Sequence, residues 1–350
     1  MRRTELLRKG SVAMTKKLLL GLLLLTIAAP EILQAQRREV VSSSLRSNRD
    51  YWTSNRMRRA RDMPLPRVSR ARMSQLLADD LGTTGDGTVS LPARELQFSS
   101  SRLVPRSARN TYPYTTVGRL FFKTRQGTFV CSASVISNRV LLTAGHCVYD
   151  SVRQRFHENF AFVPGYNNGQ YPYGVWTAKF AAVTEDWKLS NDVLPNAADF
   201  GVLVLNDREG RTIGKATGWL GFRVQSLVPN HVMILGFPTN HDGGEELHQV
   251  TSGDSVCCFN DTAVYGSDML AGSSGGPLIQ NFGQRAIGQS GANGPANRVV
   301  GVVSYGPTGG TGKFSGSSIL NESFLAIFDK ACSKGPGTCL NRGSHRKPLR

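Results

Sequence analysis

The sequence lacks the motifs of several enzyme classes. It contains no His-Glu-x-x-His metal motif, and its six cysteines form no Cys-x-x-Cys pair. The glycine-rich run Pro307–Lys313 resembles a phosphate-binding loop. However, Pro307 replaces the first glycine, and Phe314 replaces the hydroxyl residue that would reach a magnesium ion. We therefore predict no metal site and no nucleotide or other cofactor.

The sequence has few acidic residues, 25 against 42 basic ones, which gives a formal net charge of +17. About half of this charge, +8, falls in residues 36–110. A nucleic-acid-binding protein would carry such charge on a folded face with interleaved aromatic side chains. Here the arginines are scattered through polar sequence, so we predict a solvated, partly disordered segment and no nucleic-acid partner.

No apolar run comfortably reaches the length of about 20 residues that a membrane-spanning helix needs. The run Leu18–Ala29 follows the basic sequence at 14–17 and precedes Leu33-Gln34-Ala35. A basic start, a short apolar core and a small residue at a cleavage point are typical of a secretory signal peptide. We predict that residues 1–35 are such a peptide, that the protein is secreted or periplasmic, and that it has no stable membrane anchor. A retained anchor is the alternative.

The rest of the chain divides by composition into three parts. Residues 36–111 are rich in Arg and Ser, and the amphipathic fragment Met73–Leu81 predicts a helix. In a secreted protein this segment is typical of a basic propeptide or leader. A structured extension that packs on the main domain is the alternative. Residues 112–332 form the main domain, and residues 333–350 form a basic tail that we expect to be loose.

The main domain has the pattern of an all-β fold. Short β-branched and aromatic runs, separated by Gly, Asn and Pro turns, predict regularly spaced strands and hence a barrel or a sandwich. The predicted strands are Thr116–Phe122, Thr128–Ile136, Arg139–Thr143, Trp176–Ala182, Phe200–Leu205, Val232–Gly236, Pro277–Gln280 and Arg298–Ser304. Near the end, Asn321 predicts a helix cap, and an apolar stripe that should dock on the domain follows at Phe324, Leu325, Ile327 and Phe328.

The cysteines suit a secreted chain. Cys131 lies in the second predicted strand and Cys147 follows the third, so a disulfide between them would tie a strand to the turn after its neighbour. Closing that loop would stabilise the fold by about 3 kcal/mol. The pairing of the other four stays open: Cys257, Cys258, Cys332 and Cys339.

Three separated motifs supply the groups of a nucleophilic mechanism. The stretch Ala271–Pro277 places Ser274 on a tight, glycine-flanked turn, but a serine hydroxyl needs a base and an orienting acid. His146 lies just past an apolar strand. Asp199 stands at the mouth of another, where an unpaired acid would be costly. Asp192 is a competitor for the role of the acid.

The order His146, Asp199, Ser274, with cysteines bracketing the histidine, resembles a trypsin-like serine peptidase of the chymotrypsin fold. The resemblance spans about Tyr112–Cys332. It implies two antiparallel six-stranded β-barrels with a C-terminal helix and with the triad in the cleft between the barrels. It also implies that Ser274 is the nucleophile, His146 the base and Asp199 the orienting acid. The N–H groups of Gly272 and Ser274 would form the oxyanion hole.

Two departures from the family pattern bear on activation. Digestive members carry an aspartate just before the nucleophile, where this chain has Ser273. The chain also lacks an Ile-Val-Gly-Gly-like start near residue 115. Both features argue against activation through a buried ion pair with a new N-terminus. In this respect the chain is more similar to the bacterial glutamyl-endopeptidase-like branch, which also favours Gly-Ser-Ser-Gly.

The resemblance also implies which residues bind the substrate side chain: Asp268, Ser304, Tyr305 and Gly306. Glutamyl-specific members place a histidine where this chain has Val303, which argues against a preference for glutamate. Trypsin keeps an acid at the place of Asp268, and a buried carboxylate favours a bidentate guanidinium. The glutamyl-like branch also has an aspartate there, which need not face the pocket. We predict cleavage after Arg or Lys, with Arg106 or Arg109 as self-processing sites.

We therefore expect a monomeric, secreted serine endopeptidase that forms an acyl-enzyme on protein or peptide substrates. The main alternative is a catalytically inactive secreted binding protein on the same fold. A second alternative is a basic nucleic-acid or envelope-binding protein that uses residues 37–109. The joint presence of His146, Asp199 and Ser274 argues against an inactive protein, since no structural need demands all three.

Overall fold

A computed structural model describes residues 39–46, 48–69, 71–72, 96–224, 231–253, 255–259, 261–283, 295–308 and 313–340. Apart from Glu39, these residues belong to one compact unit, Val40–Arg350. The predicted signal peptide and the predicted helix at Met73–Leu81 lie outside the described residues. Within the described part of the chain, no helix has both the length and the apolar character needed to cross a membrane.

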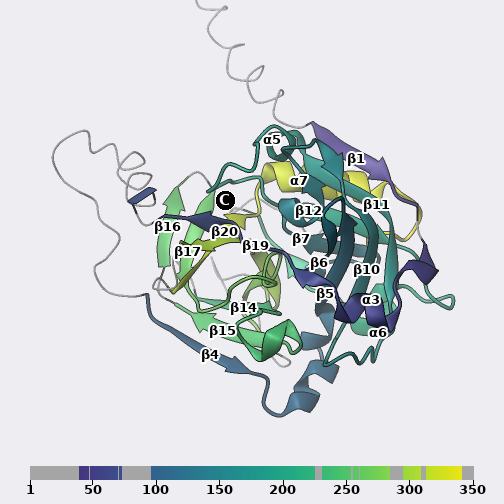
Figure 1. Ribbon diagram of the computed structural model, residues 1–350, viewed down its shortest axis with the longest axis horizontal. Coiled ribbons are helices and arrows are strands. Elements are labelled where there is room, and N and C mark those ends of the chain that lie inside the picture. Colours follow the sequence, from purple (N-terminus) through teal and green to yellow (C-terminus); the bar gives the residue numbers. More distant parts are fainter. Residues whose placement is uncertain are drawn as a thin grey trace, which may run out of the picture. The chain divides into compact units, whose positions relative to one another are not determined.

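Six antiparallel strands close on themselves and form the first barrel (Figure 1). Around the barrel the order is β10, β5, β6, β7, β12 and β11, and β11 pairs with β10 to complete the circle. Their bounds are β5 Val117–Thr124, β6 Gly127–Val135, β7 Val140–Thr143, β10 Glu158–Pro164, β11 Trp176–Thr184 and β12 Gly201–Leu205.

Strands of the first barrel are buried on both faces, which explains their nearly continuous apolar sequences. On β6, Phe129, Cys131 and Ala133 belong to a cluster of buried side chains drawn only from residues 120–213. Val130, which points the other way, belongs to a second cluster that also contains side chains of the second barrel and of the C-terminal helix. Each large apolar side chain buried in this way stabilises the fold by about 1.5–3 kcal/mol.

The second sheet curls into a half-barrel with the order β16, β17, β20, β19, β18, β14 and β15. Its bounds are β14 Val232–Gly236, β15 His248–Ser252, β16 Ser255–Phe259, β17 Thr262–Gly266, β18 Pro277–Gln280, β19 Arg298–Pro307 and β20 Phe314–Ile319. In this order β16 stands at one end of the sheet, and β15 lies near the other end, beside β4 (Phe98–Arg102). The eight strands predicted from the sequence and the two-barrel fold are confirmed.

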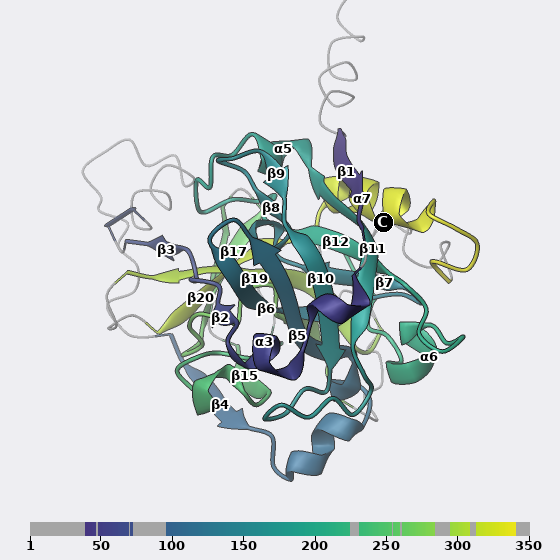
Figure 2. The ribbon, with the colours of Figure 1, turned by 45° about the vertical axis from the view of Figure 1, so that its right-hand side comes forward.

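The C-terminal helix α7, Glu322–Cys332, packs on β11 and β12 (Figure 2). Asn321 Oδ1 accepts the backbone N–H groups of Ser323 and Phe324, at 3.0 and 3.3 Å, which confirms the predicted cap. The short elements of the main domain and its N-terminal flank are β8 Tyr149–Asp150, β9 Arg155–Phe156, β13 Gly221–Phe222, α5 Glu185–Lys188, α6 Ile213–Thr217, η2 Arg106–Asn110, η3 Tyr114–Thr116, η4 Gly145–Cys147 and η5 Asp242–Gly244.

Described parts of the predicted leader are folded onto both barrels. Its elements are β1 Val40–Ser44, η1 Arg49–Tyr51, α3 Ser54–Arg58, β2 Arg61–Asp62, β3 Arg67–Val68 and β4 Phe98–Arg102. Strand β1 extends the first barrel along β11, and β4 extends the second along β15 (Figure 1). Trp52 and Met57 are buried, and the Trp52 ring lies 5.5 Å from that of Phe121. These parts are ordered, as the alternative of a packed extension expects. Removal of the leader during maturation stays a prediction.

The beginning of the tail is held in place, which corrects the expectation of a loose segment for residues 333–340. A disulfide joins Cys332 to Cys339. The Arg139 N–H donates to the carbonyl of Thr338 at 3.1 Å, and Asn138 donates to that of Gly337 at 2.5 Å. These backbone contacts, which sequence composition does not reveal, fasten the tail to the turn before β7.

Candidate active site

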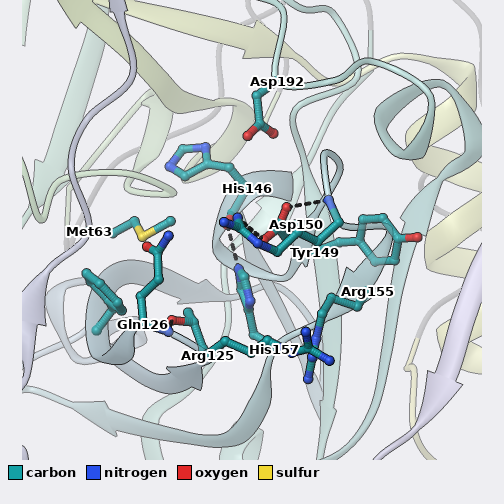
Figure 3. A pocket seen from close by; sticks show the side chains of 12 residues that line it. Met63, Arg125, Gln126, His146, Tyr149, Asp150, Arg155, His157 and Asp192 are labelled. Carbon is teal, nitrogen blue, oxygen red and sulfur yellow. Dashed lines mark hydrogen bonds and ion pairs between the residues drawn. The ribbon is translucent and has the colours of Figure 1, made fainter.

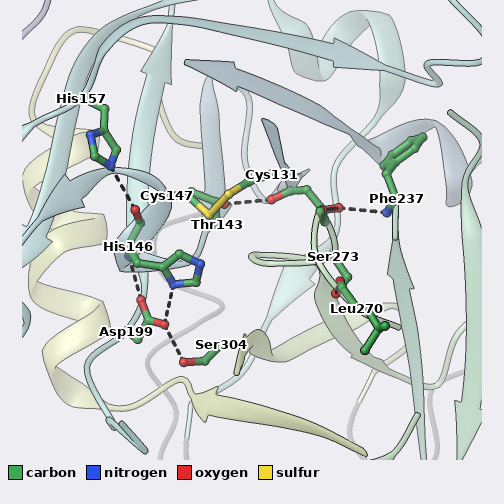
Figure 4. The surroundings of a disulfide bond; sticks show 12 residues. Cys131, Thr143, His146, Cys147, His157, Asp199, Phe237, Leu270, Ser273 and Ser304 are labelled. Carbon is green, nitrogen blue, oxygen red and sulfur yellow. Dashed lines mark hydrogen bonds and ion pairs between the residues drawn. A yellow bond between two sulfur atoms is a disulfide. The ribbon is translucent and has the colours of Figure 1, made fainter. Parts of the chain in front are cut away.

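His146 sits in the 3-10 turn η4, directly after the buried strand β7. Its neighbour Gly145 packs so closely that a Cβ there would lie 3.0 Å from both the Trp187 ring and Asp199 Oδ1. The predicted disulfide between Cys131 and Cys147 is present and ties this turn to β6 (Figure 4). The local sequence therefore fixes the histidine backbone before any substrate binds.

Asp199, just before β12, is fully buried and hydrogen-bonded to His146 twice. Its Oδ1 accepts the His146 backbone N–H at 2.8 Å, and its Oδ2 accepts the Nδ1–H at 2.8 Å (Figure 4). Ser304 Oγ also donates to Oδ2, at 2.5 Å. These bonds offset the cost of burying a carboxylate. Because Nδ1 carries the proton toward Asp199, the neutral imidazole leaves Nε2 free to accept another.

The competing acid, Asp192, has a different partner. Ser151 Oγ donates to Asp192 Oδ1 at 2.5 Å, and the backbone N–H of Asp192 donates back to Ser151 Oγ at 2.7 Å. Asp192 does line the same hollow as His146 (Figure 3). The geometry thus favours Asp199 over Asp192 as the partner of the imidazole.

Ser274 is fully buried on the turn that leads into β18. Within the described part of the chain, Ser274 Oγ and His146 Nε2 are both buried atoms without a hydrogen-bond partner. The next residue, Gly275, has φ +78°, and a Cβ there would lie 2.0 Å from Thr143 Oγ1. Only glycine allows this turn to approach the end of β7, which precedes His146 by three residues.

The predicted oxyanion loop is anchored on three sides. Gly272 has φ +89°, and its carbonyl accepts the Ser132 hydroxyl at 2.8 Å. Its N–H donates to the carbonyl of Met63 at 3.4 Å. Ser273, the departure from the family pattern, donates its hydroxyl to the carbonyl of Leu270 at 2.6 Å (Figure 4). A short local bond therefore closes the turn at the place where the digestive members have an aspartate.

Asp268 lies apart from the triad residues and already has two partners. Its Oδ1 accepts the hydroxyl of Ser100 at 2.7 Å, and its Oδ2 lies 3.0 Å from His241 Nε2. The hydroxyl of Ser100 in turn accepts from His248 Nε2 at 2.7 Å. Burial and the neighbouring His241 lower the pKa of His248 to about 4. His248 is therefore neutral near pH 7 and serves as a hydrogen-bond donor.

Ligand-type atoms of His241, His248 and Asp268 lie within 4.8 Å of one another, so a metal site must be considered. The two imidazole rings are stacked, with centroids 4.1 Å apart and planes 6° from parallel. An imidazole nitrogen binds a metal through a lone pair in the plane of its ring. Two stacked rings cannot direct their lone pairs at one ion, and the hydrogen bonds here run from His248 through Ser100 to Asp268.

The other three predicted pocket residues are neighbours on β19 with different roles. Ser304 holds Asp199, so its hydroxyl serves the imidazole pair. Tyr305 is fully buried, and its ring fills the space beside Gly316, where a Cβ would lie 2.1 Å from it. Gly306 donates its N–H to the carbonyl of Pro66 at 2.8 Å.

Sequence reasoning missed two supporting residues. Ser132 on β6 donates to Gly272 and accepts the backbone N–H of Phe237 at 3.0 Å. His157 donates to the carbonyl of His146 at 3.1 Å, and burial lowers its pKa to about 4 (Figure 4). A serine inside a buried strand was a usable signal, because a buried hydroxyl needs a partner. Nothing in the sequence pairs His157 with His146.

Comparison with known proteins agrees with this fold. The family model described as Trypsin matches residues 106–324. Over 192 residues the chain is 28% identical to a protein of Bacillus subtilis named extracellular metalloprotease, covering 52% of this chain and 57% of the relative. Over 196 residues it is 27% identical to the glutamyl endopeptidase of Bacillus licheniformis, covering 55% and 57%. The chain thus spans little more than half the length of these relatives.

Among solved structures, the protease Anisep of Arthrobacter nicotinovorans has the same fold. Its TM-score is 0.55 at 23% identity, and the match covers 67% of this chain and 100% of that protein. The likeness supports the two-barrel architecture.

Proposed function

Because the chain belongs to the trypsin family, we propose that it is a serine endopeptidase that hydrolyses peptide bonds through an acyl-enzyme. The observation that carries the proposal is the buried His146–Asp199 pair. It leaves one imidazole nitrogen unpartnered, and Ser274 Oγ is likewise buried without a partner among the described residues. A base with a free nitrogen and a serine hydroxyl that no other group occupies are the two groups that a nucleophilic mechanism requires.

In the proposed reaction, Ser274 Oγ attacks the carbonyl carbon of the substrate while His146 Nε2 takes its proton. The imidazolium is stabilised by Asp199, whose two oxygens already hold the ring and its backbone. His146 then returns the proton to the leaving amine, and water repeats the sequence on the acyl-enzyme. Ser304 keeps Asp199 oriented throughout.

The developing oxyanion would be held by the N–H groups of Gly272 and Ser274. Gly272 is suited to this role, since its carbonyl is held by Ser132 and its N–H is directed at the carbonyl of another peptide segment, that of Met63. Each such donor is worth roughly 3 kcal/mol in the transition state. The proposal therefore places the nucleophile and both donors on one loop.

The expected substrates are proteins or peptides outside the cell. Two disulfides among the described residues and the relative named extracellular support an oxidising compartment. Cleavage after Arg or Lys stays a prediction. Asp268, on which it rests, is 24% exposed in its side chain, and a substrate guanidinium must compete there with Ser100 and His241. A peptide library varied before the scissile bond tests it, and equal cleavage after Glu and Arg would remove the role of Asp268.

Fluorophosphonate labelling of the secreted chain tests the catalytic proposal. We expect the label on Ser274, loss of labelling in Ser274→Ala, and its retention in the matched variant Ser273→Ala. Loss of one member of such a triad lowers kcat by roughly 10⁴–10⁶-fold. Unchanged peptide hydrolysis by Ser274→Ala would refute the proposal and favour the inactive binding protein or another nucleophile.

A further inference from the structure

Residues 61–68, which we call the strap, run from the first barrel to the second. At one end, β2 pairs with β6 in parallel, opposite Phe129 and Val130. At the other end, β3 pairs with β19 in parallel, opposite Gly306 and Pro307. Between these ends the strap passes over the candidate active site, where Met63 lines the same hollow as His146 (Figure 3).

The backbone of the strap occupies hydrogen-bonding groups on both sides of the site. Its Met63 N–H donates to the carbonyl of Val130 at 2.8 Å, and its Pro66 carbonyl accepts the Gly306 N–H at 2.8 Å. The Met63 carbonyl faces the Gly272 N–H at 3.4 Å. This is the way an extended peptide adds to exposed strands. A peptide substrate would need the same groups.

Side chains seat the strap as well. Leu65 is 6% exposed, and a Cβ on Gly306 would lie 2.7 Å from its Cδ2. It borders a groove together with Leu270 and Ala271, which precede the predicted oxyanion residue. At the other end, Asp62 lies 3.4 Å from Arg119, a guanidinium that is almost fully buried and also pairs with Glu245.

We propose that the strap is an intramolecular inhibitor that keeps the peptidase latent until it leaves the cleft. This inference rests on the proposed function and names the regulation of the same site. Ser274 has no exposed surface and His146 is 6% exposed, and beside them the strap occupies the Val130 carbonyl and the Gly306 N–H that an extended substrate would need. The strap thereby supplies a control of activity that does not need the activating ion pair of the digestive members, which Ser273 cannot form.

The same geometry explains how the strap escapes hydrolysis. The Met63 carbonyl lies 3.4 Å from the Gly272 N–H, outside the range of about 2.7–3.1 Å that a working oxyanion hole needs. The peptide bond at that carbonyl joins Met63 to Pro64. The leaving nitrogen would be part of the proline ring, which limits how it can turn toward a proton donor. The strap therefore blocks the site without presenting an easily cleaved bond.

The test uses the full chain with its leader attached, as verified by intact mass, and measures the rate of fluorophosphonate labelling and of peptide hydrolysis. Leu65→Asp should expel the strap and raise both rates by about 30-fold, as expected when one buried leucine no longer favours the closed form. The matched control is Leu103→Asp, another buried leader leucine, 5% exposed and outside the strap, which should stay near the wild-type rate.

Each outcome decides one of the two proposals. Equal labelling of Ser274 in wild type and Leu65→Asp would refute the inhibitory role of the strap but not the proposed peptidase activity. Equal acceleration by Leu103→Asp would have the same consequence. A folded Leu65→Asp chain that neither labels nor hydrolyses would overturn the proposed function. If Leu65→Asp does not fold, Leu65→Ala replaces it, with hydrogen exchange at the Gly306 N–H as the measurement. That exchange must accelerate, because the Pro66 carbonyl is the partner that protects it.

Discussion

The two barrels hold their proposed catalytic groups in different ways. In the first barrel, His146 is fixed by contacts from the same barrel: Asp199 on its ring and backbone, His157 on its carbonyl and the neighbouring disulfide. In the second barrel, the loop around Gly272 is held by its own barrel, through Thr239 and Leu270, and also from outside, by Ser132 of the first barrel and Met63 of the leader. The base is thus preorganised locally, whereas the nucleophile loop depends on its neighbours.

This difference suits a latent peptidase. The leader contacts both barrels, but at the site its Met63 carbonyl meets the Gly272 N–H of the nucleophile loop, while the hydrogen bonds between His146 and Asp199 are intact. One hydrogen bond does not follow this division between the barrels, because Ser304 of the second barrel donates to Asp199 of the first. That bond links the two halves where the acid is most deeply buried. Variants in each half should therefore fail in different measurements.

The largest effect, on kcat, is expected from a substitution beside the base His146. Asp199→Asn should lower kcat roughly 10⁴-fold, since an amide cannot accept from both the ring and the backbone of His146 in the required tautomer. The measurement is steady-state hydrolysis together with circular dichroism. Asp192→Asn is the matched control, and its carboxylate is bound to Ser151. A comparable loss in both variants would show that the assignment of the acid is wrong.

The next largest effect, on the free energy of unfolding, is expected from removing a disulfide. Removing the Cys131–Cys147 bridge, which closes a separation of 16 residues beside the base, should cost about 3 kcal/mol in the free energy of unfolding. The control is the Cys332–Cys339 bridge, which closes 7 residues in the tail and should cost about 2 kcal/mol. Urea denaturation of the two paired Cys→Ala variants measures both. Faster peptide hydrolysis after loss of the first bridge would contradict local preorganisation of His146.

Acid should weaken the first barrel through His157. Its pKa in the folded protein is lowered to about 4 from the usual 6.5, so between these values the unfolded chain binds a proton that the folded chain does not. Stability should therefore fall by about 2–3 kcal/mol as the pH drops from 6.5 to 4, and this term should be constant above and below that window. Denaturation curves at pH 7, 5.5 and 4 measure it. His157→Gln should remove this part of the pH dependence, whereas the part due to the lowered pKa of His248 should remain and be removed by His248→Gln.

The sequence was sufficient for the parts of the site that depend on local order. Gly145, His146 and Cys147 lie together in the chain, and their arrangement follows from one turn after a buried strand. It was not sufficient for the leader. Trp52 follows Tyr51, and Leu65 stands between two prolines, in stretches too short for a period or a run to mark them as buried. Their burial depends on barrels formed by residues far along the chain, which composition cannot show.

The smallest effect, and the most direct probe of the second barrel's dependence, is expected at Ser132. Its hydroxyl bridges the Gly272 carbonyl and the Phe237 N–H, so Ser132→Ala leaves two buried backbone groups unpaired. We expect a loss of about 1–2 kcal/mol in unfolding free energy and a decrease of roughly tenfold in kcat with little change in KM. Ser134→Ala is the control, on the same strand and equally buried. Its hydroxyl has no hydrogen-bond partner among the described residues, so its removal should cost nothing. Equal behaviour of the two variants would mean that the oxyanion loop is held by its own turn, and the contrast between the barrels would then disappear.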